Sequence, residues 1–523
     1  MKFKSTILFL FISISGFAQY IPVSPDQHLY SFLNELESEH IIDNFNQSSF
    51  GWSEKYVYDL FRQAEYNSRS LNQRQKQELG FYMRFFRLFN ETNRWYEHDV
   101  DIARYGTFSM GINPPGLFIR DGNSGISIIP LAGTQIVLNS ADKSLKYHYG
   151  IKASGNFGPA GYYFSYLRTS NNTFTYEPYV QEHIPAHGFS YPSENEFKAG
   201  LSFSNQFVTA AFSFDNPELM PVSKQISALD IYTPSFPNAL IMAQPLSWLR
   251  YQFRTGYINV SYDNSNISNY INGTNLITSF ATNQLIFNPY KSIEITLGQS
   301  AFVRDNSFKS TFLLPVNFYI SDNPLHNSFL YYRINIASVQ HLNISFSQII
   351  DAFSMERMQS DYDRNVQALY FDFSLFNWPV PDLNIHGFYN IQSPLFLDHK
   401  ASPVYNLWLS TNRFPTDNRR YYGLELTMNP TFNLMIRAGY QREAFGESYS
   451  YLRTYPYDFT TLDPVKRKSD IFSFEFTIKP AYNTSIFAGI HFINHKGEDP
   501  AFRVVDYNEN VDFFFRTGFI IGL

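Results

Sequence analysis

The sequence predicts an all-β transmembrane β-barrel of about 18 antiparallel strands, preceded by a small N-terminal α-helical bundle. The first observation is an alternation of apolar and polar residues in many short segments. In residues 471–478, Phe472, Phe474 and Phe476 share one face and Glu475 lies on the other, as in a strand with one apolar side. The second is an aromatic content of 18%, and the third is a secretion signal on a chain without cysteine.

The N-terminus has the features of a signal peptide. Two lysines among the first four residues precede an apolar run over about residues 7–14, and Gly16 and Ala18 supply small residues at the cleavage positions. A membrane anchor is the alternative, but the run is well short of the roughly 20 residues that a spanning helix needs. We predict that residues 1–18 are cleaved off during export and that the mature chain resides in the outer membrane of a Gram-negative cell.

Residues 19–100 are predicted to form a helical bundle. Ser24 before Pro25 and, further on, Ser53 have the character of helix N-caps, and residues 70–73 match a capping box. Apolar residues follow each cap at helical spacing, and such stripes are more typical of a bundle core than of a ligand site. The stripes are Leu29, Phe32, Leu33 and Leu36; Tyr56, Leu60, Phe61 and Ala64; and Leu79, Tyr82, Met83, Phe86 and Phe89.

Residues 101–523 are predicted to form the barrel, because the apolar period changes to two from about residue 104. Short connections alternate with long ones, as periplasmic turns alternate with surface loops in outer-membrane barrels. An even strand count leaves both chain ends on one side, which predicts that the helices are periplasmic. The predicted strands begin near residues 125, 145, 159, 195, 206, 245, 256, 278, 292, 328, 340, 366, 382, 420, 431, 470, 482 and 511.

Two hairpins test this register. With Met428 and Phe432 both facing outward, matching the outward faces of neighbouring strands requires an odd number of residues in the turn, which predicts turns at 429–431 and 480–482. On the opposite side, several connections are long enough to enter the lumen and close it. These are residues 215–244, 304–327, 392–419 and 442–469.

The inward faces of the predicted strands carry ionisable residues. They could form a hydrolase site, but a charged, wet lumen is the better explanation, because carboxylates and arginines occur together. No Gly-x-Ser-x-Gly, phosphate-binding loop or His-Glu-x-x-His motif is present, so we expect neither catalysis nor a cofactor. The inward residues are Asp372, Glu425 and Glu475, and Arg333, Arg437 and Arg516.

Metal and nucleic-acid binding are not predicted. His183 and His187 have metal-like spacing, but Pro185 between them argues against a helix that places both on one face, and no third ligand is evident. The absence of cysteine excludes a disulfide framework and a thiolate metal site. The formal charge of −6 carries no basic footprint for nucleic acid.

The long connections after residues 392 and 442 are rich in aromatic and basic side chains. Aromatic faces stack on sugar rings, and guanidinium groups bind sugar carboxylates in a bidentate manner. Interface aromatics with ordinary solvated charge remain the alternative. The candidate polysaccharide-binding residues are Arg413, Arg419, Arg420, Tyr451, Tyr455, Lys466 and Arg467.

The helical region also resembles a known family. Leu-Tyr-Ser-Phe-Leu-Asn-Glu-Leu (29–36), His-Ile-Ile-Asp (40–43), Trp-Ser-Glu-Lys (52–55) and the segment 71–79 follow one another in an order similar to the start of Wzi-type capsule assembly proteins. The resemblance implies an outer-membrane barrel with a small periplasmic bundle, acting as a surface lectin that holds capsular polysaccharide. It assigns no binding residue by position.

Three functions therefore stay open. The chain is an anchor for capsular or exopolysaccharide, a porin or substrate-specific channel, or a subunit of a larger outer-membrane assembly. The expected surroundings are outer-membrane lipid and lipopolysaccharide, and the helical bundle would be the docking surface for a periplasmic or outer-membrane protein partner.

Overall fold

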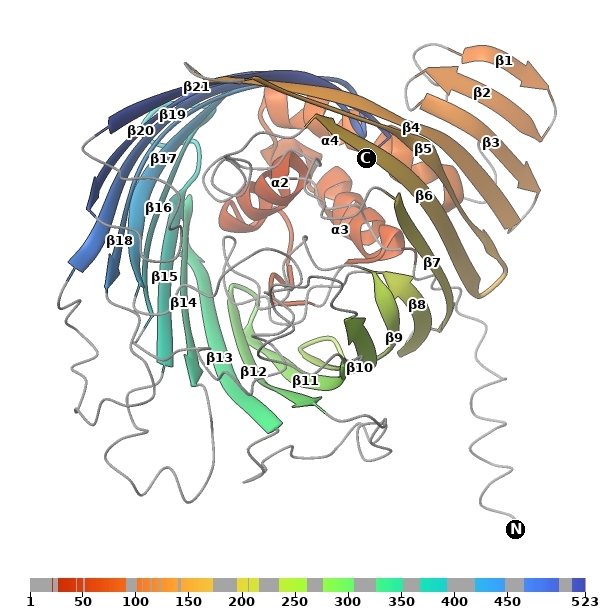
Figure 1. The fold of residues 1–523 in the computed structure, drawn as a ribbon. Helices are drawn as coiled ribbons and strands as arrows, with labels where there is room; N and C mark the ends of the chain where they lie inside the picture. Colours follow the sequence, from red (N-terminus) through yellow and green to blue (C-terminus); the bar gives the residue numbers. More distant parts are fainter. Residues whose placement is uncertain are drawn as a thin grey trace.

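Three helices precede the strands in the computed structural model (Figure 1), and their bounds are α2 Gln27–Ser38, α3 Glu54–Tyr66 and α4 Gln73–Asn90, with a 3-10 turn η1 at Ser68–Ser70. No described helix is long and apolar enough to cross a membrane. The predicted leader, residues 1–18, lies outside the described part of the chain. The structure describes residues 21, 27–43, 45–49, 52–90, 101–105, 107–112, 115–121, 124–139, 143–172, 195–205, 207–215, 235–260, 276–304, 326–350, 367–392, 419–446, 465–497 and 510–522.

The helix caps follow the sequence chemistry closely. The Ser53 hydroxyl accepts from the Tyr56 amide at 3.1 Å, as predicted for the second helix. The capping box of the third helix lies two residues later than predicted. Asn72 and Gln75 exchange bonds, with the Gln75 amide donating to Asn72 Oδ1 at 2.8 Å and the Asn72 amide to Gln75 Oε1 at 2.9 Å.

The predicted apolar stripes form the core of the bundle, which confirms the helical periodicity. Phe61 is fully buried, and its ring centroid lies 6.2 Å from that of Phe32, 5.7 Å from that of Tyr82 and 5.6 Å from that of Phe86. Side chains from three helices thus meet at one aromatic centre.

Strands β1 Asp101–Tyr105, β2 Phe108–Ile112 and β3 Pro115–Asp121 form a small antiparallel flap beside the barrel (Figure 1). The flap and the last strand share one edge of β4 Ser124–Asn139. β3 pairs with Ser124–Ile128 of β4, whereas β21 Asn510–Ile521 pairs with Ala132–Asn139. The first three strands therefore extend the sheet beside the barrel and are not part of the barrel wall.

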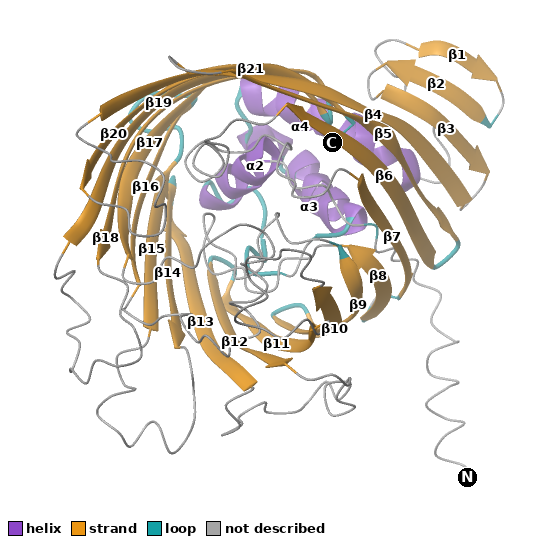
Figure 2. Cartoon of the chain, viewed as in Figure 1, coloured by secondary structure: helices purple, strands orange, loops and turns teal. Residues whose placement is uncertain are grey.

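The barrel itself has eighteen antiparallel strands, β4 to β21, and pairing of β21 with β4 closes it (Figure 2). This confirms the predicted fold class and strand number. The remaining barrel strands are β5 Lys143–Phe157, β6 Ala160–Asn172, β7 Asn195–Ser204, β8 Val208–Asp215, β9 Phe236–Leu246, β10 Leu249–Val260, β11 Leu276–Tyr290, β12 Ile293–Arg304, β13 His326–Val339, β14 Leu342–Ile350, β15 Gln367–Leu375, β16 Leu383–Gln392, β17 Arg419–Thr431, β18 Leu434–Gly446, β19 Val465–Ala481 and β20 Thr484–Gly497.

Two predicted strand starts, near 245 and 256, are wrong. β9 begins at Phe236 and β10 at Leu249, so the hairpin turn lies at 247–248. The predicted long connection 215–244 is therefore partly strand. Residues 236–243 pair with β8 and with β10, and this pairing holds the segment in the sheet.

The two faces of the wall differ as the alternation predicted. Phe472 and Phe474 each expose 52% of their surface, whereas Glu475 and Thr477, which follow on the opposite face of the strand, are 2% exposed. The apolar side chains therefore point away from the barrel and the polar ones into it, which is the arrangement of a wall surrounded by lipid.

The turns of two hairpins differ from the prediction and join the barrel to the bundle. The turn residues are 432–433 and 482–483, not 429–431 and 480–482. Phe432, expected to face outward, instead packs on Phe81 of α4 with ring centroids 5.7 Å apart. Tyr482 is buried in the bundle core, 4.5 Å from the Phe85 ring. A bulge at the end of each hairpin shifts the register and aims these rings at the helices.

Candidate functional site

Four of the seven predicted polysaccharide-binding residues lie in described strands, at the end of the barrel with the long connections. Arg413, Tyr451 and Tyr455 fall outside the described residues. Arg419 and Arg420 begin β17, and Lys466 and Arg467 follow the first residue of β19. Of this set, Arg420 is the one whose side chain is described, and it is half-buried.

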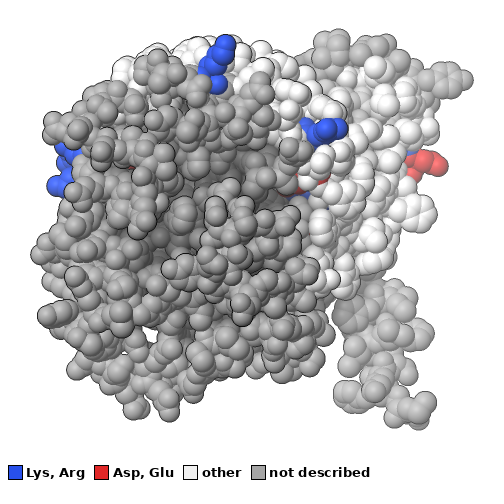
Figure 3. Space-filling model, in the orientation of Figure 1, with Lys and Arg blue, Asp and Glu red and all other residues white. Residues whose placement is uncertain are grey.

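The sheet register brings the two predicted basic pairs together. Arg419 of β17 and Arg467 of β19 are both Cα partners of Phe445, which lies on the intervening strand β18. The two residues therefore sit in one row, two strands apart, or roughly 10 Å at the usual strand spacing. In Figure 3, basic side chains are visible at the margin of the wall where β19 and β20 run in Figure 1.

The inner wall of the same sector holds a buried charge cluster. Arg516 Nη2 lies 3.0 Å from Glu475 Oε1, and Arg437 Nη1 lies 3.4 Å from Glu475 Oε2. Arg437 also approaches Glu425, and His491 Nε2 lies 3.5 Å from Glu475. Each carboxylate thus has a guanidinium partner, which is how a buried charge is tolerated. The predicted inward direction of these groups is confirmed.

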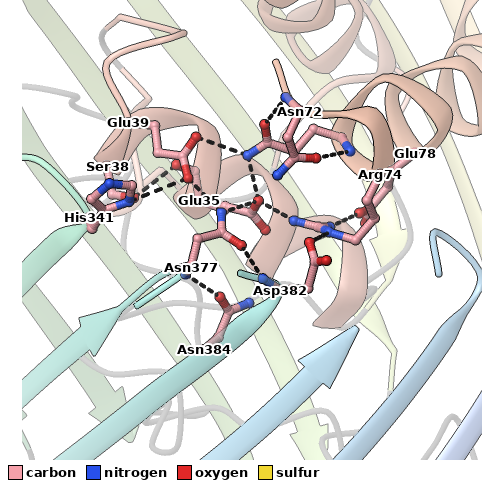
Figure 4. A network of polar contacts seen from close by, with 11 residues as sticks. Glu35, Ser38, Glu39, Asn72, Arg74, Glu78, His341, Asn377, Asp382 and Asn384 are labelled. Carbon is pink, nitrogen blue, oxygen red and sulfur yellow. Dashed lines mark hydrogen bonds and ion pairs between the residues drawn. The ribbon is translucent and has the colours of Figure 1, made fainter. Parts of the chain in front are cut away.

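A second polar network joins the helices to the end of the barrel with the short turns (Figure 4). Arg74 of α4 is its centre: Nε lies 2.5 Å from Asp382 Oδ1, in the turn between β15 and β16, and the two Nη atoms bind Glu35 and Glu78. Asn377 Nδ2 donates to Glu35 at 2.8 Å. The helix α2 is thereby tied to α4 and to the barrel by the same cation.

The segment between α2 and α3 reaches the opposite wall. Ser48 Oγ donates to Glu294 of β12 at 2.6 Å, and Gln252 of β10 donates to Ser49 Oγ at 2.7 Å. The bundle consequently contacts β10 and β12 on one side and the turns before β16, β18 and β20 on the other. It lies across the short-turn end of the barrel.

Burial of carboxyl groups in the bundle has an electrostatic consequence. Desolvation raises the pKa of Glu37 and of Glu78 to about 8, and that of Glu54 to about 7. Arg74 opposes this effect at Glu78, and Lys152 opposes it at Glu54. The interface therefore contains carboxyl groups that hold protons near neutral pH.

Sequence reasoning did not find the bundle–barrel network. Arg74 and Glu78 are four residues apart on a predicted helix, which is a normal surface ion pair in a sequence. Asp382 and Asn377 lie in a short turn, where such residues are common for conformational reasons alone. Only the docking of α4 on that turn joins them. Among the described residues, no group of three or more His, Asp or Glu could hold a metal, and the His183–His187 pair lies outside them.

An eighteen-stranded closed barrel with an apolar outer face and a polar lumen defines the class as an outer-membrane β-barrel protein. No family model and no curated protein sequence matches the chain. Solved structures do. The chain is similar to Wzi, an Escherichia coli outer-membrane protein involved in group 1 capsule assembly and a carbohydrate-binding β-barrel, with a TM-score of 0.57 and 8% identity over 96% of this chain and 99% of that one.

Two Pseudomonas aeruginosa structures also match over 76% of this chain. OpdK, solved with vanillate, has a TM-score of 0.44 and 10% identity over 98% of its own length. OccK11 has a TM-score of 0.43 and 9% identity over 95% of its length. The likeness to Wzi covers nearly the whole of both chains, so the Wzi-type architecture expected from the helical region is confirmed at the level of the fold.

Proposed function

We propose that this protein binds surface polysaccharide, capsular or exopolysaccharide, at the rim of the barrel and retains it on the cell. The observation that carries the proposal is the shared row of Arg419 and Arg467 opposite Phe445. Two basic clusters far apart in the sequence thus lie side by side, at the end where the long connections leave the wall. The fold likeness to a carbohydrate-binding barrel supports the same function.

The helices across the short-turn end favour an anchor over an open channel. An eighteen-stranded barrel is wide enough for an aqueous channel unless something fills it. Here the α2–α3 segment and α4 contact opposite sides of the wall. These contacts support a binding role over transport. Current recordings in planar bilayers test the channel alternative. Stable pores of steady conductance would favour that alternative.

The decisive experiment replaces the rim cations in the producing strain. The variant R419A/K466A/R467A keeps Arg420 and the bundle unchanged, and we expect it to move polysaccharide from the cell-bound fraction to the medium. The matched control is K76A/K291A, which removes exposed lysines at the other end of the barrel. A second variant, Y451A/Y455A, tests retention of a neutral sugar by stacking. If all variants retain polysaccharide like the parent, the proposal fails.

We further propose that the bundle faces the periplasm and docks a protein partner there. The natural chain has no cysteine, so a single introduced cysteine reports its own accessibility. Tyr66 is 91% exposed at the end of α3. In the variant Tyr66→Cys, a membrane-impermeant maleimide should label the protein only after the outer membrane is opened. Labelling in intact cells would contradict the proposed orientation, and crosslinking from the same cysteine would identify a partner.

A further inference from the structure

The outer wall of β17 to β20 is layered, and the sheet register shows the layers. Tyr440, Phe472, Phe492 and Phe513 are successive Cα partners across four strands. Tyr440 packs on Phe472 at 4.9 Å, and Phe492 packs on Phe513 at 5.1 Å. This aromatic row ends an outward apolar band that includes Phe474. Aromatic rows of this kind mark the level where hydrocarbon meets lipid headgroups.

Two residues nearer the long-loop end than the aromatic row, the side chains of the outer wall become polar. Arg442 and Asp470 are Cα partners, and they form a bidentate pair with Nε and Nη2 at 2.6 Å and 2.8 Å from the two carboxylate oxygens. The Tyr440 hydroxyl also donates to Asp470 at 2.7 Å. Asp470 is therefore paired with Arg442, and the charge of Lys496 on the neighbouring strand also acts on it.

Two residues further towards the long-loop end, the side chains of the outer wall are basic. Arg420, Ala444, Lys468 and Lys496 are successive Cα partners on β17, β18, β19 and β20, and we call them the outer-wall basic row. The row lies four residues beyond the aromatic row, or about 13 Å along the strands. Lys468 and Lys496 are exposed and stand directly opposite each other. Like charges in that position repel each other, so the outer wall carries a positive potential at this level.

We propose that the outer-wall basic row binds the phosphate groups of lipopolysaccharide in the surrounding outer leaflet. Lysine is a point charge that binds phosphate oxygens from several directions, and arginine adds a planar, bidentate donor set. A phosphorylated glycolipid places its acyl chains against the apolar band and its phosphates at the level of the row. One ligand would thus contact both the apolar band and the outer-wall basic row.

The position of the row favours a glycolipid over polysaccharide. Its members have the same outward parity as Phe472 and Phe474, so their side chains leave the barrel on the side that faces lipid. Polysaccharide held within the rim would meet the opposite face. The inference does not depend on the proposed polysaccharide function, because it concerns another face of the wall.

Purified full-length protein provides the test, with lipid A as the probe. Affinity is measured in detergent for bisphosphorylated lipid A, for enzymatically dephosphorylated lipid A and for lipid-free polysaccharide. In the variant K468Q/K496Q, we expect affinity for phosphorylated lipid A to fall at least tenfold and affinity for the dephosphorylated form to stay unchanged. The variant K468R/K496R should bind like the parent, because the cations are retained.

The matched control is K76Q/K291Q, which removes the same charge from exposed lysines at the short-turn end and should leave lipid A affinity unchanged. Heat-modifiable migration on gels shows that each variant has folded into a barrel. Equal lipid A affinity in K468Q/K496Q and the parent would overturn the proposal. A loss of binding confined to lipid-free polysaccharide would also overturn it and would assign the row to the polysaccharide surface.

Discussion

Arg74 of helix α4 donates to Asp382, which lies 308 positions later in the turn between β15 and β16, with 2.5 Å between Nε and Oδ1. The same guanidinium binds Glu35 and Glu78, so one side chain holds together two helices and the barrel. The side chain of Arg74 is 6% exposed. Its contacts have consequences that can be measured.

Replacing Arg74 with methionine should release the bundle from the barrel. The change leaves two buried carboxyl groups without their cation, and removal of one partner from a buried ion pair costs about 3–5 kcal/mol. We expect the urea concentration at the midpoint of bundle release to fall strongly. Limited proteolysis of residues 52–90 measures this release. The control Arg69→Met changes an exposed arginine in η1 and should have little effect. Equal midpoints for the two variants would contradict the central role of Arg74.

Tyr482 should anchor the bundle from the barrel side. Its ring lies 4.5 Å from Phe85 and 5.3 Å from Phe86, and 2% of the residue is exposed. Tyr482→Ala leaves a cavity in the aromatic core and should cost about 3–5 kcal/mol of docking free energy, while the barrel stays folded. Tyr290→Ala is the matched control, because Tyr290 ends β11 with 70% of its surface exposed. If the bundle of the Tyr482→Ala variant is as well protected from protease as that of the parent, Tyr482 does not anchor the bundle.

Bundle stability should decrease as pH rises. The pKa of Glu37 is raised from 4.5 to about 8, so the folded state keeps a proton that the unfolded state releases. The stabilising effect is complete below about pH 4.5 and is lost as pH rises to about 8, with a slope of up to about 1.4 kcal/mol per pH unit. Hydrogen exchange of α2, corrected for the intrinsic rate, measures this slope.

The variant Glu37→Gln isolates that carboxyl group. Glu37 accepts from Gln47 at 2.9 Å and also faces Glu294 and Arg333, so the amide keeps the size of the side chain and removes its titration. We expect the variant to show a smaller loss of protection between pH 5 and pH 8. An unchanged slope would assign the pH dependence to Glu54 and Glu78 instead.

The register of β19 predicts unequal costs for two neighbouring substitutions. Phe474 is 52% exposed on the outer face, two residues inside the aromatic row, so Phe474→Arg places a charge in lipid. Its cost should lie between the about 0–1 kcal/mol of an interface position and the about 2–4 kcal/mol of the bilayer midplane. Ser473 lies on the opposite face, and Ser473→Arg should cost much less. Folding into lipid vesicles at a series of denaturant concentrations gives both values. Equal costs would mean that the outward face has been assigned incorrectly.

The sequence by itself determined the fold class, the number of strands and the helices. Period-two alternation needs only the pleat of a strand and an environment with one apolar side, and both are local properties. The outward position of Phe472 and the inward position of Glu475 could therefore be predicted without any knowledge of partners. In the predicted connection 215–244 the prediction failed for residues 236–243, because neighbouring strands, not local preference, hold that segment in the sheet.

Only the tertiary structure decided which distant residues meet. Arg74 and Asp382, or Arg419 and Arg467, have no sequence signal that relates them, because strand register and helix docking set their distances. Bulges at the hairpin ends turned Phe432 and Tyr482 towards α4, although alternation assigned Phe432 to the outside. Alternation fixes the face on which a side chain lies, but a contact also depends on position along and around the barrel. That position results from the cooperative pairing of all eighteen strands.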